Sequence, residues 1–553
     1  MSSTNAPNRP APRSGEQTSV PELIISLLVS FVMAMTARGF VLEGFVIPTG
    51  SMAPTLMGQH INWKSPQTGW DYAFNGIPSN ESGVFPIWSR SRARGIPMSW
   101  WDPMFGLRKP AVRSTPSALV PSSGDRVIVL KSVYPFFEPD RFDVVVFKNP
   151  TDPVGPTQNY IKRLVGLPDE QFVIVDGDIF RGQLDAPADS LRIVRKPEFV
   201  QRAVWQPVYD SSFQPIDLTR WEESARSSWW GAPFVPDSGD GDWTIGTDQT
   251  WSCSSSESTT LSWNLFDWPI TDFNAYNVFR NGAPPLNTSP YPMSDLRITG
   301  VIDAKNPEAF TGTRLSMKTR ELNCEWLIED GAATLRMTEL NGGTVVASQS
   351  VDYAPPAYPF RVEFWQVDQQ MWLFADGDLI LTLPYDQWSP EQRFRASYPG
   401  ITPDQYLQNP LGPRPAPPAI EWSFSGSPFT LQNVTLDRDL FYRPTQLDRN
   451  NQKSENGPFL SGSGFGTNFL NPSRIEPDQF LLCGDNSAAS RDGRIWGRPH
   501  PLSVSYSGDD APFVVPRTNL IGKAFSVYWP APLAFPGTNS NWVPNFGKLR
   551  FIR

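Results

Sequence analysis

A long apolar run near the start of the chain restricts its folding more than any other feature. The twenty residues 23–42 read LIISLLVSFVMAMTARGFVL and contain a single charge, Arg38. A helix of this length rises about 30 Å, which matches the hydrocarbon thickness of a bilayer. We therefore expect a transmembrane helix over residues 21–42. Arg38, near its far end, can extend its guanidinium to the lipid headgroups.

The residues before this run indicate its orientation. Arg9 and Arg13 favour a cytoplasmic N-terminus, although Glu16 and Glu22 weaken the bias. A cleavable secretory signal is the alternative. We favour an uncleaved, single-pass anchor in the cell membrane, because the run is long for a signal and candidate catalytic residues follow it directly. The chain beyond the anchor then lies on the extracytoplasmic side. Residues 1–20, rich in Pro, Ser and Asn, are expected to form a disordered cytoplasmic tail.

The composition excludes several classes of protein. The chain has 553 residues, with 57 prolines but only 2 histidines and 3 cysteines. So few His and Cys cannot furnish repeated zinc fingers, an iron–sulfur framework or a disulfide-stapled scaffold, and we expect no metal site and no cofactor. The net charge of -9 gives no electrostatic reason to bind nucleic acid. Frequent proline favours loops, sheet edges and short strands over long helices.

Strand-like alternation begins at Asp125 and predicts a mostly antiparallel β domain. The runs lie at 125–134, 141–150, 159–168 and 171–180. Residues 58–123, which precede them, form an irregular insertion. Its aromatic segment can rest on a membrane surface beside nearby arginines or pack as a core loop, and the sequence leaves both open. The residues concerned are Trp100, Trp101, Met104 and Phe105.

The middle of the chain, residues 205–445, has many short strands separated by polar turns, which favours a β-sandwich or jelly roll. Residues 360–367 and 371–383 predict strands, with a hairpin turn at Asp376-Gly377. Similar alternation occurs at 296–303, 314–319, 333–340 and 429–442. The pattern resembles concanavalin-like or laminin-G-like sandwiches, without a ligand motif. A glycan or protein ligand and a spacer role both stay open, as do a Cys253–Cys324 disulfide and two free thiols.

Three short segments carry candidate catalytic side chains. Ser51 lies in IPTGSMAPTL, Lys162 in YIKRLVGLP on a predicted strand, and a polar turn spans GDNSAASRDGRIWG at 484–497. Alone, each segment is weak, since serine after glycine is usually a turn and a lysine in a strand is usually structural. His60 and His500 lie in no supporting motif, so a lysine is the more economical base for Ser51. Burial would have to lower the pKa of Lys162 by roughly three units for the amine to act as a base at neutral pH.

Taken together, the three segments resemble the bacterial type I signal peptidases, membrane-bound serine proteases with a Ser/Lys dyad. Their order agrees with that family, as do the strand pair at 127–150 and the closing run NLIGKAFSVYWP at 519–530. The resemblance covers residues 20–57, 124–182 and 475–530. The chain departs from the family pattern at Ser487, Ala488 and Ala489, at Gly493 where Ser is usual, and at Phe142 where Gly is usual.

The resemblance implies a role for each matched residue. Ser51 is the nucleophile and Lys162 the general base, while the Ser51 N–H and the Thr49 hydroxyl form the oxyanion hole. Ser490 orients the lysine, and Asp492 and Arg494 support the loop. The substrates would be secretory preproteins that carry signal peptides, met at the surface of membrane lipid.

The resulting prediction is a mostly β protein. Its catalytic domain spans 43–204 and 446–530, is interrupted by the sandwich at 205–445, and is followed by a C-terminal tail at 531–553. A self-cleaving Ser/Lys peptidase like the SOS repressors is disfavoured by the anchor and the RIWG sequence. A different class is a catalytically degenerate peptidase that acts as a membrane-anchored glycan- or protein-binding module.

Overall fold

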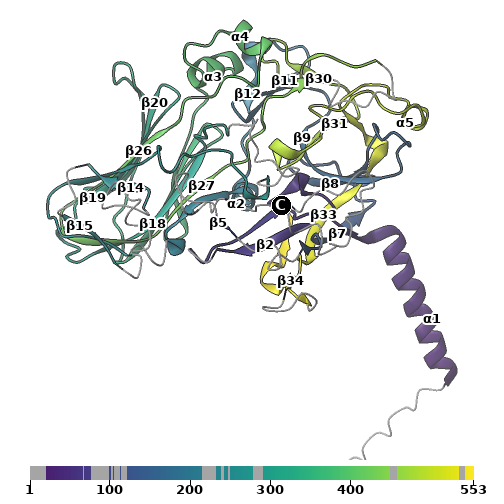
Figure 1. Ribbon diagram of the computed structural model, residues 1–553, viewed down its shortest axis with the longest axis horizontal. Helices are drawn as coiled ribbons and strands as arrows, with labels where there is room; N and C mark the ends of the chain where they lie inside the picture. The colour runs from purple at the N-terminus through teal and green to yellow at the C-terminus, as the bar shows by residue number, and fades with distance from the viewer. Residues whose placement is uncertain are drawn as a thin grey trace, which may run out of the picture.

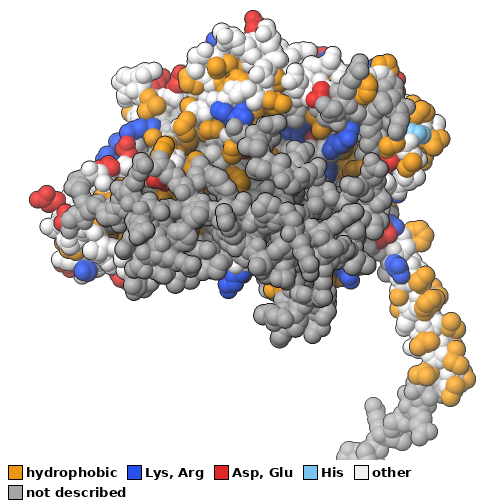
Figure 2. Space-filling view, viewed as in Figure 1, with side chains coloured by type: hydrophobic (Ala, Val, Ile, Leu, Met, Phe, Trp, Pro, Cys, Tyr) orange, Lys and Arg blue, Asp and Glu red, His pale blue; other side chains and the backbone are white. Residues whose placement is uncertain are grey.

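The computed structural model places an apolar N-terminal helix beside a mostly β body (Figure 1). It describes residues 20–65, 68–75, 99–100, 104, 112–113, 121–214, 232–237, 242–246, 250–277, 290–448, 458–534 and 542–553. Helix α1 (Val20–Thr36) continues through a π-turn, η1 (Ala37–Val41). Hydrophobic side chains cover it along its length (Figure 2). With a mean hydropathy of 2.0, Val20–Val41 fits a single-pass anchor or a signal sequence. The predicted tail before Val20 lies outside the described residues.

The described chain forms two bodies: the first contains the strands outside residues 205–445, and the second is the sandwich. The main sheet of the first body combines strands from both ends of the chain. In spatial order it contains β1 (Leu42–Val46), β7 (Arg126–Lys131), β33 (Leu520–Trp529), β8 (Val144–Lys148), β9 (Asn159–Gly166), β31 (Gln479–Cys483) and β32 (Val515–Pro516), with β36 (Arg550–Phe551) also beside β33. Every pairing is antiparallel. Strands from before and after the sandwich therefore lie side by side, as β7 and β33 do in Figure 1.

A second sheet has four strands and leads toward the sandwich. Its order is β12 (Arg192–Ile193), β11 (Asp178–Gln183), β10 (Glu170–Val175) and β30 (Ser473–Ile475). The strand-like run at 171–180 is a hairpin, because Asp176 and Gly177 both take positive φ, at 50° and 86°. Two such residues make the tight turn whose twist matches that of the flanking strands. Helix α2 (Glu198–Val204) follows.

Two packed sheets form the sandwich. One contains β15 (Trp243–Ile245), β16 (Trp251–Cys253), β27 (Phe429–Arg438), β18 (Leu296–Ala304), β23 (Phe360–Val367), β24 (Gln370–Ala375) and β25 (Asp378–Pro384), with β13 (Gln206–Asp210) on β27. The other contains β14 (Phe234–Pro236), β17 (Thr259–Trp263), β26 (Ala419–Ser425), β19 (Gly312–Thr319), β20 (Leu322–Glu329), β21 (Ala332–Glu339) and β22 (Val345–Asp352). Aromatic side chains join them: Phe364 of the first sheet lies 5.6 Å from Trp422 of the second, between ring centroids.

The prediction of a mostly β fold with one N-terminal apolar helix is confirmed. The predicted hairpin turn joins β24 to β25, with φ of 50° at Asp376 and 92° at Gly377. Cys253 and Cys324 lie on opposite sheets as free thiols, so the disulfide alternative is not formed.

Small elements complete the fold. They are the sheet of β2 (His60–Lys64), β3 (Asp71–Asn75) and β6 (Pro121–Ser122), the pairs β4 (Ser99–Trp100) with β5 (Val112–Arg113), β28 (Gln446–Leu447) with β29 (Gly462–Ser463) and β34 (Leu533–Ala534) with β35 (Trp542–Val543), and helices α3 (Pro390–Ser397), α4 (Pro403–Gln408) and α5 (Pro501–Ser507). The proposed membrane-contact segment lies mostly outside the described residues, and the one side chain described there, Met104, is fully buried.

Candidate active site

Ser51 lies in a loop, residues 47–59, that leaves β1 and folds back on the main sheet. We call it the serine loop. It contains one 3₁₀ turn, η2 (Gly50–Met52). The Ile47 N–H donates to the Asp125 carbonyl at 2.9 Å, and the Asp125 N–H donates to the Met57 carbonyl at 2.8 Å. Met52 is fully buried in the core of this sheet. Packing and backbone bonds thus fix the loop on both sides of the half-buried serine.

The structure brings Lys162 of β9 directly to Ser51, 111 residues away in sequence. Lys162 Nζ lies 2.5 Å from Ser51 Oγ and 3.1 Å from the Ile161 carbonyl oxygen. The lysine is 3% exposed. Burial lowers its pKa from 10.5 to about 8, against the opposing effect of the nearby Asp492 and Asp485 carboxylates.

This shift changes how much base is present at neutral pH. With a pKa of about 8, about one lysine in ten is neutral at pH 7, against about one in 3,000 at the ordinary value. Burial therefore raises the concentration of the proton-accepting amine about 300-fold. A serine in contact with such an amine is the arrangement that activates a hydroxyl nucleophile.

The turn at 484–497, which we call the motif loop, holds the serine loop from the other side. The Asn486 N–H donates to the Ser51 carbonyl at 3.1 Å, and Asn486 Nδ2 donates to the Gly50 carbonyl at 2.9 Å. A Cβ on Gly484 would lie 2.4 Å from the Ser51 carbonyl oxygen and 2.2 Å from Ser490 Oγ. Glycine at position 484 is therefore what lets the two loops approach so closely.

Asp492 and Arg494 form a buried ion pair inside the motif loop. Arg494 Nε and Nη2 lie 2.9 and 2.7 Å from the two Asp492 carboxylate oxygens. Burial would raise the pKa of Asp492, but Arg494 outweighs it and holds that pKa below its ordinary value. Arg494 Nη1 also donates to Ser487 Oγ at 2.7 Å. Ser487, a departure from the family pattern, thus serves as an acceptor that orders the loop.

The other two predicted residues lie at the site without the contacts expected of them. Ser490 is buried beside Gly484, and no hydrogen bond within the described chain joins its hydroxyl to Lys162. Thr49 precedes η2, is exposed, and makes no side-chain cap to that turn. The orienting role of Ser490 and the oxyanion role of Thr49 stay predictions.

Sequence reasoning missed a second buried ion pair, between Arg163 and Asp485. Arg163 Nε and Nη2 each lie 2.8 Å from a carboxylate oxygen of Asp485, and both side chains are fully buried. Arg163 Nη1 donates to the carbonyl of Phe142, and Thr55 Oγ1 donates to Asp485 at 2.5 Å. The Arg163–Asp485 pair connects strand β9, the serine loop and the motif loop. The sequence signal for this pair consisted of two charged residues, Arg163 directly after Lys162 and Asp485 directly after Gly484.

Phe142, where the resemblance expects glycine, has a φ of 74°. This left-handed backbone explains why glycine suits the position.

Neither histidine contacts Ser51. His60 Nδ1 lies 2.6 Å from the Gly58 carbonyl, and burial lowers the pKa of its imidazole. His500 accepts from the Leu502 N–H at the start of α5.

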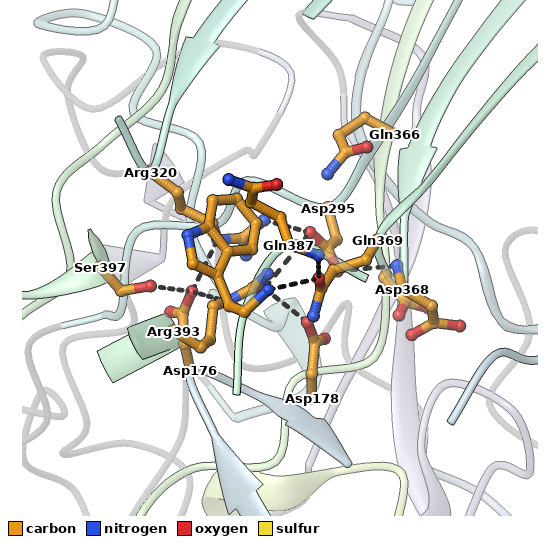
Figure 3. Close-up of polar contacts among 12 residues, drawn as sticks. Asp176, Asp178, Asp295, Arg320, Gln366, Asp368, Gln369, Gln387, Arg393 and Ser397 are labelled. Atoms are coloured by element: carbon orange, nitrogen blue, oxygen red, sulfur yellow. Dashed lines mark hydrogen bonds and ion pairs between the residues drawn. The ribbon is translucent and has the colours of Figure 1, made fainter. Parts of the chain in front are cut away.

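A cluster of carboxylates lies away from Ser51, where the β10–β11 hairpin meets the sandwich (Figure 3). Its members are Asp178, Asp295, Asp368 and Asp439, whose ligand atoms lie within 4.8 Å of one another. Arg393 Nη2 lies 2.5 Å from Asp178, Arg320 Nη1 lies 2.5 Å from Asp295, and Lys196 Nζ lies 2.7 Å from Asp368. Lys196 Nζ also lies 2.7 Å from Asp439, so each of the four carboxylates has an arginine or lysine partner. The cluster is thus an ion-pair network between the hairpin and the sandwich.

Comparison with known protein families gives one match. Residues 109–191 match the family model of signal peptidase, peptidase S26. The matched segment includes Lys162 and Arg163 but neither Ser51 nor the motif loop. It supports a hydrolase of the signal peptidase family, whose substrates carry signal peptides. No curated protein matches the chain.

Solved structures match the chain at low similarity. A carbohydrate binding module from Bacillus subtilis is 9% identical and covers 37% of this chain and 96% of its own, with a TM-score of 0.22. A Bacillus subtilis protein of unknown function with a galectin-like fold is 10% identical, covers 38% and 92%, and has a TM-score of 0.23. Sheep galectin-11 in complex with glycerol is 10% identical, covers 26% and 92%, and has a TM-score of 0.17.

Proposed function

We propose that the protein is a membrane-anchored serine endopeptidase of the signal peptidase I type. It removes N-terminal signal peptides from secreted preproteins through an acyl-enzyme formed on Ser51. The observation that carries this proposal is the 2.5 Å contact between Ser51 Oγ and a buried Lys162 Nζ. The family match over residues 109–191 supports it independently.

The acylation step follows from this contact. Neutral Lys162 Nζ accepts the Ser51 hydroxyl proton as Oγ attacks the carbonyl carbon of the scissile peptide bond. The negative charge that forms on the carbonyl oxygen is stabilised by the Ser51 N–H and the Thr49 hydroxyl. The Lys162 ammonium then gives its proton to the leaving amine, the C–N bond breaks, and the signal peptide stays esterified to Ser51.

Deacylation uses the same base. Neutral Lys162, regenerated when the amine leaves, accepts a proton from water as the water oxygen attacks the ester carbonyl. The tetrahedral intermediate collapses, the bond to Ser51 Oγ breaks, and the lysine returns the proton to the serine. The products are the signal peptide with a free carboxylate and the mature protein with a free amine.

An open strand edge beside the dyad suits an extended substrate. On one side, β9 pairs with β8 from Asn159 to Arg163. On its other side, β31 pairs with β9 only from Arg163 to Gly166. Within the described chain, the stretch 159–162 therefore has a free edge next to Lys162. A peptide that adds there as a strand would present its backbone carbonyl to Ser51.

Contacts near the helix end support a location at the membrane surface. Lys131, at the end of β7, donates to the Gly39 carbonyl at 3.2 Å and pairs with Glu43 at 3.1 Å. Phe136 and Phe137 follow β7 and are 80% and 68% exposed. Aromatic side chains exposed beside a membrane anchor suit the bilayer interface. We propose that the peptidase body rests there, on the extracytoplasmic side, where the signal peptide of a substrate is held in the same bilayer.

Cleavage of a purified preprotein by the full chain in detergent tests the proposal. The wild type should cut once, after a small-residue signal-peptide motif. Ser51→Ala and Lys162→Ala should each lose activity by at least about 1,000-fold, because nucleophile and base act as a unit. Ser505→Ala and Lys305→Ala, at exposed positions, provide matched controls with wild-type rates. Undiminished cleavage by Ser51→Ala would refute the dyad.

We propose a second, separate role for the sandwich, binding of a saccharide. A surface hollow of about 450 Å³ at one end of the sandwich is lined by Phe310, Tyr353 and Tyr358 together with Glu329 and Asp330. Aromatic faces and carboxylate acceptors suit a sugar ring and its hydroxyls. Wild-type chain should bind on a glycan array and Tyr358→Ala should not. Equal binding by both would refute this site.

A further inference from the structure

The inserted sandwich reaches the serine loop through a short segment, residues 273–277, that ends in the 3₁₀ turn η10 (Ala275–Asn277). The amides of Asn277 and Asn486 bond to each other in both directions, at 2.7 and 2.8 Å. Tyr276 Oη donates to the Gln59 carbonyl at 2.7 Å, near the end of the serine loop. Each of these contacts joins a residue of the sandwich region to the candidate active site.

Asn486 connects Asn277 to the serine. A side-chain amide has two hydrogens and one oxygen. In Asn486 one hydrogen goes to the Gly50 carbonyl, the other goes to Asn277 Oδ1, and the oxygen accepts from Asn277 Nδ2. Asn277 therefore holds the Asn486 amide in place through two bonds, and the Gly50 carbonyl sets which way that amide faces. A flipped amide would place its oxygen against the Gly50 carbonyl oxygen.

The Gly50 carbonyl belongs to the same peptide unit as the Ser51 N–H, the predicted oxyanion donor. Because a peptide unit is planar and trans, its carbonyl and its N–H point in opposite directions. Fixing the Gly50 carbonyl on Asn486 therefore also fixes the direction of the Ser51 N–H. A donor that is aimed before the reaction begins is what stabilises a developing oxyanion.

Tyr276 restrains the same peptide from a second direction. A Cβ on Gly50 would lie 1.8 Å from a carbon of the Tyr276 ring, so the ring packs directly on the glycine. Tyr276 is 5% exposed. Gly50 is thus held between this ring and the Asn486 amide.

The segment is itself held firmly. Arg443 pairs with both carboxylate oxygens of Asp272, one of them through Nη2 at 2.9 Å. Arg438 Nη2 donates to the Phe273 carbonyl at 3.1 Å. The Arg443 carbonyl in turn accepts from Arg494 of the motif loop at 3.0 Å. One mostly buried ion pair, at the residue before the segment, and two hydrogen bonds to backbone carbonyls thus set the position of the segment relative to the motif loop.

We propose that Asn277 and Tyr276 are positioning residues of the peptidase, which aim the Ser51 N–H through Asn486 and Gly50. This inference rests on the proposed function. It makes the inserted sandwich part of the catalytic unit rather than an appended module.

Preprotein cleavage by the full chain tests the inference. Asn277→Ala should lower kcat about tenfold and leave KM within about twofold, because the donor acts mainly on the transition state. Its pH midpoint should stay near the wild-type value, since Lys162 remains buried. The double variant with Asn486→Ala should be no slower than Asn486→Ala alone, because both changes break one linkage. Asn323→Ala, which removes a bond to Ser316 inside the sandwich, should cleave like the wild type.

Several outcomes would overturn the inference. They are a wild-type kcat in Asn277→Ala, losses that add in the double variant, or a pH midpoint that rises together with a fall in Tm. Since Asn277 is only half-buried, the alanine variant leaves no large cavity. If it nevertheless fails to fold, Asn277→Ser provides the same comparison. Cleavage by wild type with an unaffected Asn277→Ala would leave the dyad standing, whereas cleavage by Ser51→Ala would remove the proposed function and this inference together.

Discussion

Replacing Lys162 with methionine should stabilise the folded chain while it abolishes cleavage. The lysine is buried, and its pKa falls from 10.5 to about 8. This difference corresponds to about 3 kcal/mol by which the fold disfavours the ammonium at neutral pH. Methionine has a similar length and no charge. It loses the hydrogen bond to Ser51 Oγ, which costs about 1 kcal/mol, so we expect a net gain of about 2 kcal/mol.

The gain should depend on pH in a defined direction. Because the pKa of Lys162 is lower in the folded chain, the unfolded chain binds more protons between pH 8 and 10.5. Wild-type stability therefore rises with pH across this window, and the Lys162→Met variant lacks the rise. The advantage of the variant should be full near pH 7 and should vanish by about pH 10.

Thermal unfolding of the full chain in one detergent, near pH 7 and near pH 10, measures this effect. For a unit of this size, about 2 kcal/mol corresponds to a Tm increase of about 2 °C. Lys305→Met, at an exposed position of the sandwich, is the matched control and should show no change in its Tm difference with pH. A lower Tm of Lys162→Met near pH 7, or the same difference at both pH values, would show that burial does not lower the pKa of Lys162.

Three further predictions concern the site and its connection to the sandwich. The wild-type cleavage rate should rise with pH to a midpoint of about 8, since only neutral Lys162 accepts a proton; a midpoint near 10.5 would contradict the effect of burial. Arg163→Met should lower the free energy of unfolding by about 3–5 kcal/mol, because Asp485 stays buried without its cation, and Arg163→Met with Asp485→Leu should recover much of that loss in thermal unfolding. Replacing residues 205–445 with a short linker should yield no folded peptidase, because the buried carboxylates of the β10–β11 hairpin lose their arginine partners; a folded, active product would contradict this.

The elements of the fold were accessible from the sequence because they depend on local patterns. Apolar residues over 23–42 predicted the helix by length and hydropathy alone. The strand-like runs from Asp125 onward predicted β7, β8 and β9. Strand β7 buries one face, whereas β8 and the second half of β9 are buried on both faces. The Asp376-Gly377 turn was predictable because few residue pairs accept positive φ at both positions.

The candidate site was predictable only in part. The order of the motifs indicated that Ser51 and Lys162 meet, which is the contact that the structure contains. It did not indicate that Arg163 and Asp485 pair, because a single charge in a strand or turn has no periodic pattern that identifies its partner. The structure also adds a reason for the motif-loop glycine, since Gly484 lies against the Ser51 carbonyl.

The relation between the two bodies lay beyond the reach of sequence patterns. Composition and strand spacing predicted a separate sandwich inserted at 205–445. The contact of Asn277 with Asn486 joins residues 209 positions apart and involves one short segment outside any strand. Such contacts depend on how complete domains dock, which local patterns do not determine.

Trapping the acyl-enzyme tests directly whether Ser51 is the nucleophile. The full chain is quenched with acid during turnover of a preprotein, digested, and searched by peptide mass spectrometry for an ester. We expect the signal peptide esterified to Ser51 in the wild type and no ester in Ser51→Ala. Cleavage without an ester on Ser51, or an ester on another residue, would contradict this expectation.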